Sequence, residues 1–108
     1  MNDDVTIGIV VPANHPALAG HFPGQPVVPA VVMLDAVLAE IQARGDFVLR
    51  SIPTVKFLNA VMPGERVELR LRFNAAAGAP QTRVNFQGLR ATTLVFEGSF
   101  LVAANSKP

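Results

Sequence analysis

The fold is decided by the stretch PAVVMLDAVLAEIQAR, residues 29–44. Apolar residues fill most positions after the proline, and the only interruptions are Asp35, Glu40, Gln42 and Arg44. A helix that is apolar on most of its faces is buried, so we expect residues 30–44 to form the central helix of the core. Pro29 suits the first turn of that helix, because its missing N–H would have no intrahelical partner there. Gly45 is the expected stop.

The periodicity changes on both sides of this helix. Residues 5–11 carry β-branched side chains at every second position, which predicts a strand that Pro12 ends. After the helix, strands are expected at residues 47–57, 66–73, 82–89 and 92–102. Consecutive strands joined by turn signals favour an antiparallel sheet.

One apolar helix against one antiparallel sheet is an α+β architecture. We expect the sheet to wrap around the helix, which is the hot-dog arrangement. Such a sheet leaves an edge strand open, and a second subunit could cover it. Residues 1–108 are expected to form a single domain, with residues 104–108 as a frayed tail.

Composition narrows the class of protein further. Half of the 108 residues are hydrophobic, which suggests apolar surface that a partner subunit covers. The formal net charge is only +1, so bulk electrostatics gives no reason to expect nucleic-acid binding. The chain has no cysteine, which excludes disulfides and thiolate metal sites and fits a cytoplasmic protein. No apolar run approaches the roughly 18 residues of a membrane helix, and the acidic N-terminus does not have the pattern of a signal peptide.

The loop before the helix holds the densest chemistry of the chain. Residues 20–30 read GHFPGQPVVPA, and the carboxylate of Asp35 follows five residues later. Prolines and glycines at this density predict a loop with fixed turns. On residue type alone, His21 could be a loop histidine bonded to nearby backbone, and Asp35 could be a structural carboxylate.

This segment resembles the signature of the β-hydroxyacyl-(acyl carrier protein) dehydratases, G-H-F-P-G-x-P-[VI]-[MV]-P-G followed five residues later by Glu or Asp. A second block, VKFLNAVMPGE at residues 55–65, resembles a later strand-and-turn element of the same family. The resemblance covers roughly residues 5–103. In its details it looks most like the small dehydratases of specialised lipid or polyene clusters.

The resemblance implies a hot-dog enzyme of lipid metabolism that removes water from a (3R)-hydroxyacyl thioester without a cofactor or metal. By resemblance, His21 is the base and Asp35 is the acid or water-orienting group. The N–H of Ala30 would polarise the thioester carbonyl, the carbonyl of Val27 would orient the imidazole, and Phe22 and Gly24 would belong to the substrate loop. Acyl carrier protein or an acyl thioester would be the partner, and a homodimer, with higher oligomers open, would share each site between its subunits.

The dehydration reaction itself needs three groups, and they match the roles that the resemblance implies. Removing an α-proton near neutral pH suits imidazole, expelling hydroxide needs a proton donor, and charge on the thioester oxygen needs a preorganised N–H, such as one at a helix start. Apolar neighbours on the predicted helix would help Asp35 to keep its proton.

One position departs from the family pattern and leaves other functions open. Ala30 stands where the family has glycine: its N–H survives, but its Cβ could narrow the site, slow it or change the substrate. We therefore keep two alternatives, a hot-dog acyl thioesterase that uses Asp35 and a non-catalytic acyl-binding subunit. The thioesterase gives no reason for the loop around His21.

Overall fold

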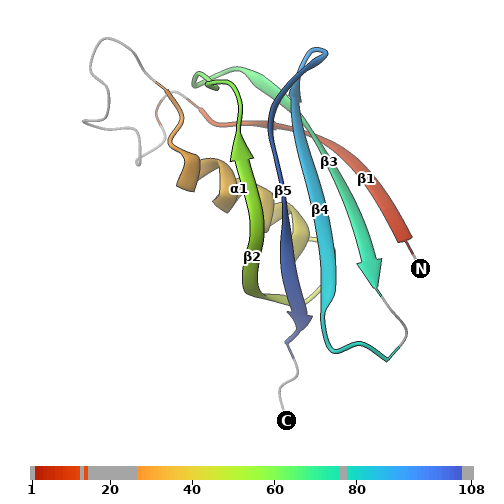
Figure 1. Cartoon of the computed structure of the whole chain (residues 1–108). Helices are drawn as coiled ribbons and strands as arrows, with labels where there is room; N and C mark the ends of the chain where they lie inside the picture. The colour runs from red at the N-terminus through yellow and green to blue at the C-terminus, as the bar shows by residue number, and fades with distance from the viewer. Residues whose placement is uncertain (1, 13, 15–26, 76–77, 106–108) are drawn as a thin grey trace.

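The computed structural model describes residues 2–12, 14, 27–75 and 78–105 (Figure 1). The elements follow one another as β1 (Asn2–Val10), α1 (Ala30–Gln42), β2 (Phe47–Phe57), β3 (Arg66–Ala75), β4 (Thr82–Arg90) and β5 (Thr93–Ala104). All five strands form one sheet in the order β1-β3-β4-β5-β2, and every neighbouring pair is antiparallel. Figure 1 shows α1 lying against one face of this sheet. The predicted α+β hot-dog fold is confirmed.

Most ends of the predicted elements lie within two residues of the observed ends, and strand pairing explains the larger differences at the first strand and at the tail. The first strand begins at Asn2 and not at residue 5, because the whole of β1 pairs with β3 from Asn2↔Asn74 to Val10↔Arg66. The tail expected at residues 104–108 is wrong at its start. Ala104 pairs with Phe47, and the N–H of Asn105 donates to the carbonyl of Asp46 at 2.8 Å. Pairing with β2 therefore holds β5 in place to its end, and residues 106–108 lie outside the described part.

The core lies between α1 and the inner face of the sheet. From the helix, Val32, Met33, Val37 and Ile41 are buried. From β3, alternate residues are buried, and their charged neighbours point to the other face, as the sequence predicts. The central strands add a group of phenylalanine rings, in which the centroids of Phe86 and Phe100 lie 5.0 Å apart.

Burial of α1 is less complete than the sequence predicts. The helix contributes one buried stripe to the core, whereas Val31 on the opposite side is 63% exposed and Asp35 and Ala39 are also exposed. The expectation of a helix buried on most faces is therefore wrong for a single chain. One sheet covers one side of one helix, so the apolar residues on its other side remain in contact with solvent.

Gly98 lies where the inner face of the sheet must make room for a ring. A Cβ at this position would collide with the backbone carbonyl of Thr54 on β2 and would lie 2.8 Å from the Phe86 ring. The absence of a side chain at Gly98 thus lets β5 pair closely with β2 while Phe86 packs over it. At this point β5 pairs with β2, which carries half of the large exposed apolar side chains of the described residues.

Candidate active site

The residues assigned to the active site divide into two groups. His21, Phe22 and Gly24 lie outside the described residues, so their predicted roles stay predictions. Val27, Ala30 and Asp35 are described, and they lie at the start of α1 or on its first two turns. Asp35 is five residues beyond Ala30, or about 7.5 Å further along the helix axis at 1.5 Å per residue.

The start of α1 is held by the backbone of a distant turn. The N–H of Val28 donates to the carbonyl of Val61 at 2.8 Å, and both side chains are buried. Pro29 then takes an extended conformation (φ −60°, ψ 148°) as the N-cap residue, and its carbonyl accepts from the N–H groups of Val32 and Met33. This arrangement begins the helix at Ala30 without a side-chain cap.

The N–H of Ala30 is available at this helix end. The first N–H groups of a helix have no intrahelical acceptor, and within the described residues no other acceptor is bonded to this one. Ala30 is exposed, and the positive end of the helix dipole adds to the pull on a negative oxygen. The geometry at this residue is therefore suited to polarise a carbonyl.

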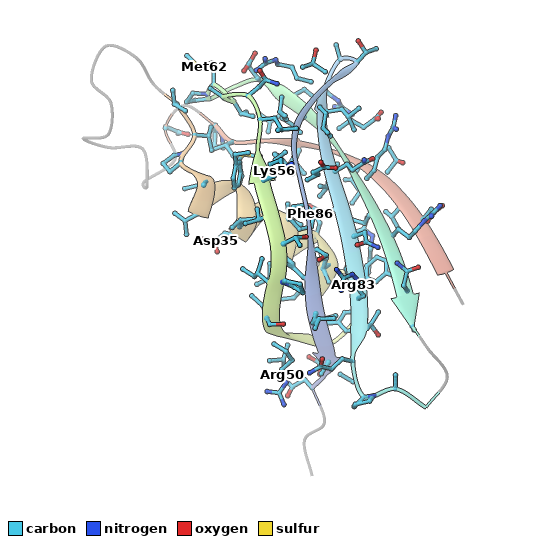
Figure 2. All side chains as sticks on the ribbon, viewed as in Figure 1. Asp35, Arg50, Lys56, Met62, Arg83 and Phe86 are labelled. Carbon is cyan, nitrogen blue, oxygen red and sulfur yellow. The ribbon has the colours of Figure 1, made fainter. Side chains whose placement is uncertain are left out.

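The Asp35 carboxylate lies on the open side of α1. It is exposed, and it follows Val31 by four residues, so the two side chains share one helix face. Figure 2 shows Asp35 projecting from α1 beside the edge of β2. Within the described residues it has no hydrogen-bond or ion-pair partner. The expected burial of this carboxylate among apolar residues is therefore wrong for the single chain, since the sheet covers only the other side of α1.

Next to this face, β2 forms the outer edge of the sheet. It pairs with β5 on one side, and all residues from 51 to 60 are exposed. The large exposed apolar side chains of the described residues gather mainly here and on the adjoining turn: Val48, Ile52, Val55, Phe57, Leu58 and Met62, with Val31 on the helix. An apolar edge strand of this length favours pairing with another chain.

A groove of about 810 Å³ lies elsewhere, on the face of the sheet opposite α1. Its floor is a row of residues that crosses all five strands, and its walls are polar side chains, among them Thr6, Arg70, Gln87, Glu97 and Lys56. Asp35, Ala30 and Val27 do not line this groove. Among the described residues, this groove and the candidate active-site residues therefore lie on opposite sides of the sheet.

The outer face also carries the clearest electrostatic interaction of the described residues. The Arg72 guanidinium donates to both oxygens of Asp4, at 3.0 and 3.3 Å. These hydrogen bonds hold the pKa of Asp4 below its ordinary value of 3.8 and raise the pKa of Arg72. Both side chains are well exposed, so water screens the pair. Among the described residues, no group of three acidic, histidine or cysteine side chains could hold a metal ion.

Sequence reasoning missed one cluster beside the site. The turn of residues 59–65 contains Val61, which receives the Val28 N–H, and this turn is bound by Glu65 and Arg90. Glu65 belongs to the second family-like block, but nothing in the sequence pairs it with an arginine 25 residues later. Only the β4–β5 hairpin brings Arg90 to the turn.

Comparisons with known proteins identify the family of the chain. The family model described as "ApeI-like: ApeI dehydratase" matches residues 1–98. The 3-hydroxyacyl-[acyl-carrier-protein] dehydratase FabZ of Allorhizobium ampelinum is 38% identical over 79 residues, which are 64% of this chain and 51% of that protein. The chain spans about half the length of the curated relatives that it matches.

Solved structures share the fold. An uncharacterized protein of Erwinia carotovora subsp. atroseptica superposes with a TM-score of 0.74 at 25% identity, over 98% of this chain and 87% of that one. The dehydratase heterocomplex ApeI:P of Xenorhabdus doucetiae gives a TM-score of 0.72 at 20% identity, over 95% and 94%. No helix in the described residues has the length and apolar character to cross a membrane.

Proposed function

The chain belongs to the ApeI-like dehydratase family, and on that premise we propose that it removes water from a (3R)-hydroxyacyl thioester to give the trans-2-enoyl thioester. The substrate is carried by acyl carrier protein in the cytoplasm, and the reaction needs no cofactor. The FabZ relatives act by name on 3-hydroxyacyl-[acyl-carrier-protein], which supports the reaction and the carrier.

The observation that best supports this reaction is that α1 carries both a hydrogen-bond donor and a carboxyl group that are open to a substrate. Within the described residues, the N–H of Ala30 has no acceptor at the helix start, and the Asp35 carboxylate has no partner on the open helix face. An N–H at a helix end stabilises the negative charge that grows on the thioester oxygen. A carboxyl group about 7.5 Å further along the axis is placed to act at a different atom of an extended acyl chain.

In the proposed reaction, His21 takes the proton from the α-carbon. The electron pair of the C–H bond moves toward the thioester carbonyl, whose oxygen accepts a hydrogen bond from the Ala30 N–H. The same electron pair then forms the double bond between the α- and β-carbons as the C–O bond of the β-carbon breaks. Asp35 donates the proton with which the hydroxyl group leaves as water. The imidazole proton returns to the Asp35 carboxylate through solvent, and this restores the enzyme.

A second copy of the chain completes the site in this proposal. The open edge of β2 and the apolar residues beside it favour a partner. With a two-fold axis beside β2, we propose that each site takes His21 from one subunit and Asp35 from the other. Covering this face would also remove water from Asp35, which the single chain leaves exposed.

Incubation of the purified chain with a 3-hydroxyacyl thioester, on acyl carrier protein and on coenzyme A, tests the function. We expect mass spectrometry to show an enoyl thioester that is about 18 mass units lighter than the substrate, which is the mass of one water. We also expect faster turnover of the substrate on acyl carrier protein than of the substrate on coenzyme A. Free thiol in place of enoyl product would indicate the thioesterase. The mass of the chain in solution tests the dimer and any higher oligomer.

A non-catalytic acyl-binding subunit is the second candidate, and two observations favour it. Ala30 adds a Cβ where the family pattern has glycine, and the Xenorhabdus doucetiae structure is, by its title, a dehydratase heterocomplex. In that case the chain alone would bind the acyl thioester without forming product. Activity would arise only after addition of a second, different hot-dog chain.

A further inference from the structure

The turn of residues 59–65 is held by a partly buried ion pair between Glu65 and Arg90. Nη1 of Arg90 donates to the carbonyl of Ala60 at 2.6 Å and lies 3.2 Å from Oε1 of Glu65. The same carboxylate oxygen accepts the N–H of Met62 at 2.7 Å. Each of the two charged side chains is about one third exposed, so two-thirds of each is shielded from water.

Backbone bonds add to this closure. The N–H of Glu65 donates to the carbonyl of Met62 at 3.2 Å, and the N–H of Gly64 donates to the carbonyl of Val11 at 2.8 Å. Gly64 has a φ of +86°, a left-handed conformation that glycine adopts at low cost. The turn is therefore a closed unit in which Ala60, Met62 and Glu65 are all bonded.

This unit bonds directly to the start of α1. Val61 lies between Ala60 and Met62, and its carbonyl accepts the N–H of Val28 at 2.8 Å. Val28 is one residue from Val27 and two residues from Ala30. Since α1 has no side-chain cap, this bond and the buried side chain of Val28 are described contacts that fix where the backbone enters the helix.

We propose that Glu65 and Arg90 are positioning residues for the active site. By holding the 59–65 turn, they set the position of Val28 and so the direction of the Ala30 N–H and of the Val27 carbonyl. The inference rests on the proposed function, in which these two backbone groups bind the thioester oxygen and the imidazole. A small displacement of such groups costs catalysis more than binding, because the donor must meet the oxyanion and not the ground-state carbonyl.

The chain provides a matched control for this pair. Glu68 and Arg70 form an ion pair of 2.9 Å on β3, on the outer face of the sheet. Its members are more exposed than Glu65 and Arg90, and neither bonds to the 59–65 turn in the described structure. Glu68→Gln therefore removes one carboxylate of an arginine pair without touching the helix start.

The test compares Glu65→Gln, Arg90→Met, Arg90→Lys and Glu68→Gln with the unaltered chain. For Glu65→Gln and Arg90→Met we expect kcat to fall by about 10- to 100-fold with KM within about twofold, as for a misplaced catalytic donor. Arg90→Lys keeps a cationic donor and should retain most of the activity. Glu68→Gln should match the unaltered chain.

Amide hydrogen exchange gives a readout that does not depend on activity. The Val28 amide should exchange at least about tenfold faster in Glu65→Gln and Arg90→Met, while the Leu71 amide on β3 keeps its rate, because opening would be local. Unchanged exchange at Val28, equal acceleration at Val28 and Leu71, or faster Val28 exchange with unchanged kcat would each overturn the inference. If the unaltered chain forms no enoyl product, the proposed function fails, and exchange at Val28 alone decides whether the pair holds the helix start.

Discussion

Replacing Asp35 with asparagine tests whether the carboxylate of Asp35 acts in catalysis or only in the structure. The side chain is exposed and has no partner among the described residues, and asparagine has nearly the same shape. Surface substitutions of this kind change the free energy of unfolding by less than about 0.5 kcal/mol. Loss of a general acid lowers turnover by about 100- to 10,000-fold. We therefore expect Asp35→Asn to unfold at the same urea concentration as the unaltered chain and to form almost no enoyl thioester.

Mixing this variant with His21→Ala tests whether the sites are shared. Random exchange of subunits makes about half of the dimers mixed. In each mixed dimer, the shared-site geometry places an intact His21 opposite an intact Asp35 at one of the two sites. The mixture should therefore recover about a quarter of the unaltered activity, although each variant alone is inactive.

The assay follows enoyl thioester formation before and after subunit exchange, with exchange verified by native mass spectrometry. No recovery in verified mixed dimers would refute the shared site. Turnover of Asp35→Asn within a few-fold of the unaltered chain would refute the role of the carboxylate. A loss of stability well above 0.5 kcal/mol would show that Asp35 has a structural partner outside the described residues.

Three further predictions concern the rest of the chain. Ala30→Gly keeps the helix-start N–H and should leave kcat equal or higher in the same assay; a large loss would show that the methyl group contacts the substrate. Gly98→Ala should lower the free energy of unfolding in urea by about 1–3 kcal/mol, because the new Cβ meets the Thr54 carbonyl, and an unchanged midpoint would contradict that packing. The Asp4–Arg72 pair lowers the pKa of Asp4 in the folded chain. The stabilisation by this pair is therefore present above the pKa that Asp4 has in the unfolded chain, and it is lost as the pH falls through the lowered pKa of the folded chain. The difference in stability between Asp4→Asn and the unaltered chain should narrow below about pH 4, and a difference that stays constant would contradict the role of the pair.

The sequence predicted the fold wherever a pattern is local. Alternation along residues 67–73 identified β3, and the apolar run after Pro29 identified α1, because each pattern is produced by a single element facing one core. Two expectations failed for a common reason. Asp35 is exposed because the sheet covers only one side of α1, and Ala104 is paired because β2 lies beside β5; a local pattern contains neither fact. The bond from Arg90 to the 59–65 turn escaped for the same reason.

The open face of α1 carries both exposed apolar residues, which the hydrophobic composition of the chain predicts, and the carboxylate of Asp35. One sheet covers only one side of the helix, so Val31 and the β2 edge expose apolar area in the single chain. A partner that covers this area stabilises the complex by burying it, and the same contact would exclude water from the carboxylate of Asp35. Association and catalysis would then depend on the same surface. The identity of the partner decides between the two proposed functions: a second copy supplies its own His21, whereas a different chain would have to supply the base itself.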